Sequence, residues 1–374
     1  NFTSRKAGLP PLPQFSSFYY FRFSGPAGEQ TQTTHHKASS SAYCAHLSYL
    51  FLGRRQKERM TLRLRGCVCV GRTLLSTFGE SRRRFLLLSR RSMSYKFETL
   101  AVSTPADHVF HVEINRPEKM NAMNAAFWEE LPKCFQQLHN DKKCRAVVIS
   151  GAGKMFTAGL DFKSMMNEFM QQNTGDGEEP DVARKARHLY NMITSYQGTF
   201  TSMEKCSKPV IAAVHNGCIG GGVNLITACD MRYCTSDAYF QIKEVELGLA
   251  ADVGVLQRLP RVIGNRSLVS ELVFTGRRME AAEAREAGLV SRIFPDKAQM
   301  LSAAVAVAKE IASKSPVAVQ GSKVNLVYSR DHAVDEALHF MACWNMSMLQ
   351  SEDVVKSVMA LMEKAKEPPK FANL

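Results

Sequence analysis

Apolar residues along the chain gather in short runs that are separated by longer stretches of mixed polarity. Three runs predict buried strands, at residues 109–114, 146–150 and 210–214. The first run ends in an Asn-Arg-Pro turn, and a helix is expected from about residue 124 to residue 138. Strands that alternate with helices in this way favour an α/β fold with a buried sheet.

Beyond the last of these strands the pattern becomes helical. Ala- and Val-rich segments begin near Ser302, and a further helical stretch covers residues 335–364. A polar segment with the sequence QQNTGDGEEP lies within residues 163–180 and predicts a surface loop. No run of 18 apolar residues is free of charge, so the pattern predicts no membrane span.

The chain divides into four parts by composition. Residues 1–59 lack an initiating Met and any sustained periodicity, and we interpret them as a non-native or disordered extension. Residues 60–93 carry eight arginines and one acidic residue, which is the pattern of a mitochondrial presequence; a disordered basic arm is the alternative. We expect a folded core over residues 94–300 and a helical region over residues 301–374.

The formal net charge of +13 would suit a nucleic-acid-binding protein, but its location argues against one. Residues 1–93 hold 16 Lys/Arg and 3 Asp/Glu, so the rest of the chain holds 32 basic and 32 acidic residues. The folded part is therefore neutral and has no global attraction for a phosphate backbone. We expect no nucleic-acid partner.

The ten cysteines are scattered along the chain. The folded part contains no CxxC pair and no His/Cys cluster at the spacing of metal ligands. This pattern predicts buried thiols in a reducing compartment and no metal site.

Two glycine-containing segments could bring backbone N–H groups together. The first is MFTAGLDF at residues 155–162, and the second is GCIGGGVN at residues 217–224. Each lies between a predicted strand and a predicted helix, where glycine allows close backbone approach and the helix N-terminus offers free N–H donors. Two such donors aimed at one oxygen form an oxyanion hole. Alone, either segment is more often a tight turn; together they indicate a site.

These segments and the stretch NRPEKMNA at residues 115–122 resemble the crotonase (enoyl-CoA hydratase/isomerase) family in order and spacing, over about residues 97–365. The resemblance implies a spiral core of repeated ββα units with a C-terminal helical region. It implies that this region joins the chain into a homo-oligomer, either a trimer or a dimer of trimers. It also implies an acyl-CoA thioester substrate and no separate cofactor, because CoA is part of the substrate.

The family motifs imply a role for particular residues of this chain. The oxyanion donors are expected to be the N–H groups of Ala158 and Gly221, which hold the thioester oxygen as it becomes enolate-like. Four neighbours are expected to bind substrate: Gly159, Leu160, Asp161 and Phe162. The CoA moiety is expected near three residues of the opening stretch: Arg116, Lys119 and Met120.

The chemistry also needs groups that move protons. Family hydratases carry one Glu three residues after the middle Gly of the triplet and a second Glu twenty residues later. Here these positions hold Asn224, which cannot exchange a proton with substrate, and Glu244. A third acid, Asp252, lies in the small and apolar stretch GLAADVG, where burial of an unpaired carboxylate would be costly and would raise its pKa. A lone acid is more often a solvated surface charge.

The spacing of Glu244 and Asp252 resembles the branch that converts 3,5-dienoyl-CoA to 2,4-dienoyl-CoA in unsaturated fatty-acid β-oxidation. That branch usually carries Asp where this chain has Asn224. The implied mechanism is a 1,5 proton shift, in which a carboxylate removes a proton from carbon 2 and a second acid delivers one to carbon 6. Positional match assigns Glu244 to carbon 2 and Asp252 to carbon 6, and the reverse assignment stays open.

Two alternatives share the same scaffold. One is an enoyl-CoA hydratase or another isomerase of the family, although a hydratase would lack its second carboxylate at Asn224. The other is a catalytically silent binding scaffold. For localisation, the presequence pattern predicts the mitochondrial matrix. The final Ala372-Asn373-Leu374 keeps only the Leu of a peroxisomal signal, which makes the peroxisome the weaker alternative.

Overall fold

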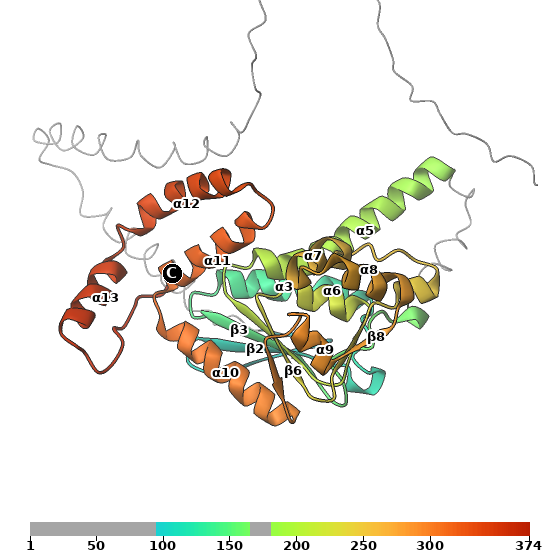
Figure 1. The fold of residues 1–374 in the computed structure, drawn as a ribbon, viewed down its shortest axis with the longest axis horizontal. Coiled ribbons are helices and arrows are strands. Elements are labelled where there is room, and N and C mark those ends of the chain that lie inside the picture. The colour runs from blue at the N-terminus through green and yellow to red at the C-terminus, as the bar shows by residue number, and fades with distance from the viewer. Residues whose placement is uncertain (1–94, 165–180) are drawn as a thin grey trace, which may run out of the picture. The chain divides into compact units, whose positions relative to one another are not determined.

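A six-stranded sheet forms the centre of the computed structural model, which describes residues 95–164 and 181–374 (Figure 1). The strand order is β1-β2-β3-β4-β6-β9; β1 and β2 pair antiparallel, and the later pairs are parallel. The strands are β1 (Leu100–Ala106), β2 (Val109–Ile114), β3 (Ala146–Gly151), β4 (Val210–Val214), β6 (Met231–Thr235) and β9 (Arg292–Phe294). The three predicted strands are confirmed as β2, β3 and β4.

A smaller sheet contains β5 (Gly217–Ile219), β7 (Tyr239–Gln241) and β8 (Arg278–Glu280), in the order β5-β7-β8. Two successive units of the core each contribute one strand to the large sheet, then one to the small sheet, and then a helix. Thus β4 and β5 lead into α6 (Gly221–Thr227), and β6 and β7 lead into the 3₁₀ helix η4 (Glu244–Leu247). The expected α/β fold with repeated ββα units is confirmed.

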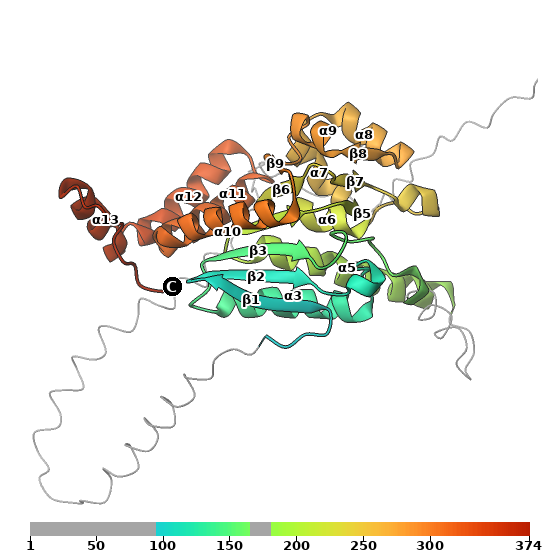
Figure 2. The ribbon, with the colours of Figure 1, turned by 90° about the horizontal axis from the view of Figure 1, so that it is seen from below.

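The strands β3 and β4 in the middle of the large sheet are buried on both faces, which explains their nearly continuous apolar sequences. All six residues of β3 are buried, and they alternate between two clusters. Val147 and Ile149 pack in the cluster that contains α3 (Ala125–Asn140). Val148 packs in the other cluster, against α10 (Lys297–Ser313), which follows the opposite face of the sheet (Figure 2). Three alanines of α10 allow this close packing: Ala304, Ala308 and Ala312.

The helix predicted over residues 124–138 is α3, and its start has a clear cause. The Asn124 side chain accepts a hydrogen bond from the Phe127 N–H, so it caps the first turn. The remaining helices follow the chain order: α5 (Val182–Lys205), α7 (Val255–Ile263), α8 (Arg266–Thr275), α9 (Ala281–Glu286), α11 (Pro316–Ser329), α12 (Val334–Met348) and α13 (Glu352–Met362).

The boundary predicted at residue 300 falls inside α10, whose inner face belongs to the core. The helical region that follows the core therefore begins after Ser313 and contains α11, α12 and α13. Much of the apolar surface of α12 and α13 is exposed. The exposed side chains are Val334, Leu338, Met346, Leu349, Val354, Val355, Val358, Met359, Leu361 and Met362.

Six of the seven cysteines in the described part of the chain are buried, and all seven are free thiols. Burial raises the pKa of the Cys218 thiol well above its usual value, so this thiol stays neutral and unreactive. The exception is Cys343, which is exposed. The buried thiols predicted from the sequence are therefore confirmed for these six residues.

The predicted extension, the presequence and most of the polar insertion lie outside the described residues. Within residues 95–164 and 181–374, no helix is both long and apolar enough to cross a bilayer.

A buried ion pair holds α11 against the core. Lys323 is 4% exposed, and its Nζ lies 2.8 Å from Asp230 Oδ2. The same ammonium donates to the carbonyls of Met203 and Lys208, while Asp230 Oδ2 also accepts the Val210 N–H at the start of β4. One charge pair thus joins α11, the end of α5 and the large sheet.

We expect Lys323→Met to lower the free energy of unfolding by about 3 kcal/mol, because it leaves the Asp230 carboxylate unpaired and two carbonyls without a donor. Urea unfolding followed by circular dichroism measures the loss. The matched control is Lys309→Met, at an exposed position of α10, which should change the stability by less than ~0.5 kcal/mol. Equal effects of the two changes would contradict the structural role of the pair.

Candidate active site

The second glycine segment turns the chain from β5 into α6. Gly220 has φ 51°, and its N–H donates to the Gln241 carbonyl of β7 at 2.8 Å. A Cβ on Gly222 would lie 2.5 Å from Cγ2 of Thr157, so only glycine fits where α6 meets the first segment. The second segment therefore ends at a short helix whose first turn rests directly on the first segment.

Gly159 is the point where the two segments touch. Its φ is 85°, and a Cβ there would lie 2.7 Å from the Ile219 carbonyl oxygen and 3.6 Å from the Gly221 nitrogen. The first segment reaches this position because Thr157 forms a parallel bridge with Cys218 of β5. The backbone amides of both segments are consequently brought to one place, as the sequence predicted.

The amides that remain free are those of Leu160 and Gly221. Within the described part of the chain, neither N–H donates a hydrogen bond to another group. The Ala158 N–H, by contrast, donates to the Met120 carbonyl at 2.9 Å. The prediction that Ala158 supplies an oxyanion donor is therefore wrong in this structure, because that amide is already used to join the segment to the loop before it. Ala158 still borders the cavity described below.

The buried side chain of Asn121 holds the first segment in place. Its Nδ2 group donates to the carbonyls of Ala152, Met155 and Phe156, at 2.7, 2.9 and 3.2 Å. Its Oδ1 accepts the Arg116 N–H at 2.9 Å. One amide therefore joins the start of the first segment to the backbone of the opening stretch. The motif match predicts only a CoA region for the stretch around Asn121, because the tertiary role of this buried Asn, at φ 56°, leaves no signal in the local sequence.

Two of the three predicted CoA-region residues are exposed, and the third, Arg116, already binds other groups of the protein. Lys119 and Met120 lie on the surface, with Met120 57% exposed. The Arg116 guanidinium donates to the Ala122 carbonyl and pairs with Asp161 Oδ2 at 3.1 Å. Burial favours the neutral form of Asp161, but the Ser164 N–H and Arg116 outweigh it and lower the pKa of this carboxyl. Arg116 and Asp161 thus tie the opening stretch to the first segment.

Glu244 lies beside the second segment. It is the first residue of η4, and its Oε1 is 3.9 Å from the position that a Cβ on Gly220 would occupy. Oε1 accepts a hydrogen bond from Asn224 Nδ2 at 3.1 Å, whereas Oε2 is buried and has no partner in the described part of the chain. Desolvation raises the pKa of Glu244, and the charge of Asp252 adds to the rise.

Asp252 is exposed, in contrast to the burial that its apolar neighbours suggested. It lies on the short segment between Gly248 (φ 71°) and Gly254 (φ 123°), which we call the Asp252 arm. Gln197 of α5 donates from Nε2 to the Asp252 carbonyl at 2.7 Å. Leu249 on the same arm is 47% exposed. The sequence singled out Asp252 because an acid in an apolar stretch is unusual. In the structure the stretch is apolar because it borders a cavity.

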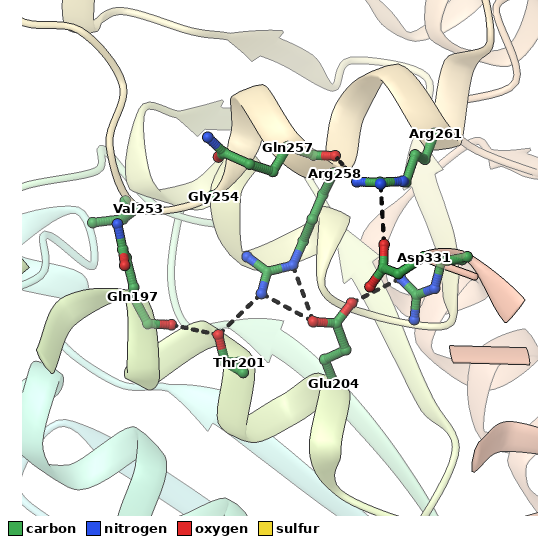
Figure 3. A pocket seen from close by; sticks show the side chains of 10 residues that line it. Gln197, Thr201, Glu204, Val253, Gly254, Gln257, Arg258, Arg261 and Asp331 are labelled. Carbon is green, nitrogen blue, oxygen red and sulfur yellow. Dashed lines mark hydrogen bonds and ion pairs between the residues drawn. The ribbon is translucent and has the colours of Figure 1, made fainter. Parts of the chain in front are cut away.

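A network of charged side chains holds the C-terminal end of the Asp252 arm. Figure 3 shows a pocket next to the arm, in which Arg258 of α7 reaches across to Thr201 and Glu204 of α5. Glu204 also pairs with Arg330, just beyond α11, at 2.9 Å. A Cβ on Gly254 would lie 2.0 Å from Nη1 of Arg258, so the guanidinium packs directly on the end of the arm. The arm is therefore anchored at its C-terminal end.

Both acids and both free amides border one cavity of about 300 Å³. The remaining walls are largely apolar, which suits an acyl chain. They include Trp128, Phe162, Leu189, Met192, Ile193, Tyr196, Leu247, Leu249 and Val253. Trp128 and Tyr196 stack with ring centroids 4.4 Å apart; these two residues lie far apart in the sequence, so the analysis of motifs did not find them.

The predicted site residues around the cavity therefore fall into two groups. Ala158, Leu160, Phe162, Gly221, Glu244 and Asp252 line the cavity. Gly159, Asp161 and Asn224 lie behind the lining and support it. Among the described residues, no three His, Cys, Asp or Glu side chains gather as a metal site would require.

Comparison with known proteins identifies the class of protein. Residues 105–372 match the family model described as enoyl-CoA hydratase/isomerase, and the chain therefore belongs to this family. A crystal structure of an enoyl-CoA hydratase from Bacillus anthracis superposes with a TM-score of 0.64 at 28% identity, over 74% of this chain and 99% of that one.

Several relatives carry the name of one branch of the family. The Rattus norvegicus protein named mitochondrial Delta(3,5)-Delta(2,4)-dienoyl-CoA isomerase is 60% identical over 78% of this chain and 87% of its own length. The Homo sapiens protein of the same name is 61% identical, over 72% of this chain and 80% of its own. An Arabidopsis thaliana protein named as the peroxisomal form is 42% identical, over 75% of this chain and 99% of its own.

We expect Gly159→Ala to lower turnover by at least ~10²-fold, because the added Cβ would displace the Ile219 carbonyl and separate the two free amides. The matched control is Gly198→Ala on α5, where a Cβ meets nothing within 4 Å. The control should keep the parent turnover and gain about 0.5–1 kcal/mol of stability from a better helix former. A folded Gly159→Ala protein with the parent turnover would show that the contact is not needed.

Proposed function

We propose that this protein is a dienoyl-CoA isomerase that converts 3,5-dienoyl-CoA to 2,4-dienoyl-CoA in unsaturated fatty-acid β-oxidation. The observation that carries the proposal is that Glu244 and Asp252 border the same cavity as the two free amides. The names of the rat and human relatives support the same reaction.

The amides of Leu160 and Gly221 are the proposed oxyanion donors. Each lacks an acceptor in the described part of the chain, and both line the cavity. Two N–H groups that are already oriented stabilise the negative charge that develops on the thioester oxygen, without reorganisation at the moment of reaction. The CoA portion, which leaves the cavity at the thioester end, would lie near the exposed Lys119 and Met120.

Glu244 is the proposed base at carbon 2. Its carboxyl lies next to Gly220, at the oxyanion end of the cavity, and carbon 2 is the atom bonded to the thioester carbon. When Glu244 takes this proton, the electron pair spreads over the thioester oxygen and the diene. Asp252, which is exposed and has taken a proton from solvent, then delivers that proton to carbon 6, the 3,5-diene becomes the 2,4-diene, and Glu244 releases its proton to solvent. The protein supplies no cofactor, because CoA belongs to the substrate.

Hydration fits the site less well. Adding water to an enoyl-CoA requires groups that position the water and take its proton, and Asn224 cannot take one. Asn224 instead donates to Glu244. A silent scaffold fits less well too, since it would have no need for a carboxylate oxygen that is buried without a partner.

The exposed apolar surface of α12 and α13 supports a homo-oligomer. Large apolar patches on a protein surface usually mark an interface. We propose a trimer, or a dimer of trimers, formed through these helices. For localisation, the rat and human relatives are named mitochondrial and the Arabidopsis relative peroxisomal. The arginine-rich residues 60–93 support import into the mitochondrial matrix.

Glu244→Gln and Asp252→Asn should each slow isomerisation by at least ~10²-fold, because each removes one proton transfer and keeps the size of the side chain. The double change should lose far less than the product of the two single losses. The assay follows the absorbance of the conjugated 2,4-dienoyl product from a 3,5-dienoyl-CoA.

Exchange of the carbon-2 hydrogen in deuterated water separates the two roles. Asp252→Asn should still permit exchange, whereas Glu244→Gln should suppress it. The reverse pattern would exchange the two roles and keep the site. If neither variant slows the enzyme tenfold, the two acids are structural and the proposed function is wrong.

Leu361→Glu combined with Met362→Glu should convert the oligomer into monomers, because two charges would be buried at an apolar interface. Sedimentation equilibrium measures the mass. Val182→Glu is the matched control: it places the same charge at an apolar residue that is 83% exposed on α5, and it should leave the mass unchanged. A monomeric parent protein would contradict the proposed assembly.

A further inference from the structure

Asn224 is a fully buried polar residue between the two catalytic candidates. It lies in α6 and is 0% exposed. Its Oδ1 accepts the Val255 N–H at 2.6 Å, at the first residue of α7. Its Nδ2 donates to Glu244 Oε1 at 3.1 Å and to the Gly220 carbonyl at 3.2 Å. All the polar atoms of this side chain are therefore engaged.

The partners of Asn224 require an amide in one orientation. A backbone N–H can only donate, so the atom that faces Val255 must be an oxygen. A carbonyl and an ionised carboxylate can only accept, so the atom that faces Gly220 and Glu244 must carry hydrogen. An ionised Asp would satisfy Val255 but would place a second negative oxygen against Glu244. An amide satisfies both sides at once.

We propose that Asn224 is a positioning residue that keeps Glu244 ionised, leaves Oε2 as the oxygen that takes the substrate proton, and fixes Glu244 relative to the Asp252 arm. The inference rests on the proposed function. It adds to that function a role for Asn224, the amide that lies between the two proposed acids.

The first part of the proposal follows from the two oxygens of Glu244. Oε1 is engaged by Asn224, while Oε2 is buried and has no partner in the described part of the chain. A proton taken from substrate therefore goes to Oε2. The hydrogen bond to Oε1 stabilises the charged form and opposes the desolvation that raises the pKa of Glu244.

The second part follows from the position of Val255, three residues after Asp252. The Asp252 arm ends where α7 begins, so the hydrogen bond from Val255 to Asn224 holds the C-terminal end of the arm. Gln197 holds the same arm from α5 through the Asp252 carbonyl. The Asn224 side chain thus contacts Glu244 through its Nδ2 and the C-terminal end of the arm through its Oδ1.

The remaining charged or titratable groups around Glu244 set the background for a pH experiment. Asp252 on the arm, Lys243 before η4 and Tyr196 of α5 border the same cavity. Asp252 raises the pKa of Glu244 by its charge. Replacing Asn224 also releases the Val255 N–H that holds the end of the Asp252 arm, so a control that loosens the arm alone is needed before a shift of the pH profile is assigned to the contact between Asn224 and Glu244.

The experiment compares Asn224→Asp, Asn224→Ala and the parent. The readout is the pH dependence of carbon-2 hydrogen exchange in a 3,5-dienoyl-CoA, because this step depends on ionised Glu244. In Asn224→Asp two adjacent carboxyls share a proton, so the acid limb should move up by at least ~1 pH unit. Asn224→Ala removes a donor to the charged form, so the limb should move in the same direction by less.

The matched control is Gln197→Leu, which releases the Asp252 arm but removes no donor from Glu244. It should lower turnover and leave the acid limb of exchange in place. A limb that moves as far in this control as in Asn224→Asp would overturn the proposal, because the shift would then reflect loosening of the site.

Two further outcomes are distinct. A folded parent that neither isomerises the dienoyl-CoA nor exchanges its carbon-2 hydrogen would refute the proposed function. An active parent whose acid limb is unchanged in both Asn224 variants would refute the positioning role alone. Circular dichroism and thermal unfolding establish which variants are folded; if Asn224→Asp does not fold, the direction of the limb in Asn224→Ala decides.

Discussion

The site depends on the hydrogen bonds of a single buried amide, the side chain of Asn121. The segment at residues 155–162 crosses the interior without belonging to a regular strand or helix, so several of its carbonyls have no secondary-structure partner. Leaving such groups unpaired in the interior costs about 1–3 kcal/mol each. Asn121 supplies donors to Ala152, Met155 and Phe156, and only with these bonds can an irregular backbone lie against β5. The irregularity is in turn what leaves the Leu160 N–H free.

The amide of Gly221, on the second glycine segment, is free for a different reason. Gly221 opens a regular helix, and its N–H is free because the first residues of any helix lack an intrahelical acceptor. One oxyanion donor therefore comes from an irregular loop held by a side chain, and the other from the ordinary geometry of a helix end. The two meet because Gly159 and Gly222 lack a Cβ at the contact. The large sheet positions both segments, since β3 and β4 are neighbours in parallel register.

The sequence predicted most of the scaffold and only part of the site. The strands β2, β3 and β4 were predictable because they are largely buried and therefore nearly continuously apolar. The seven-residue strand β1 was not predicted, because most of its residues are exposed. The strands β5, β7 and β8 have three residues each, which is too short for any periodicity to show. The acids and the glycine segments were identified through their resemblance to the family's motifs, but that resemblance assigned the free amide to Ala158 rather than Leu160. Which amide is free depends on where the Met120 carbonyl lies, and that is a tertiary contact. The exposure of Asp252 was missed for a similar reason, because the sequence does not distinguish the neighbouring Ala251, which packs into the core, from Asp252, which lines the cavity.

The different surroundings of the two acids have an isotopic consequence. Asp252 is exposed and exchanges hydrogen with water, whereas the free oxygen of Glu244 is buried at the other end of the cavity. The hydrogen that reaches carbon 6 is therefore drawn from the solvent and not from carbon 2 of the same molecule. In tritiated water carbon 6 would therefore take up label at every turnover, whereas label at carbon 2 would appear only as fast as Glu244 exchanges its proton with solvent.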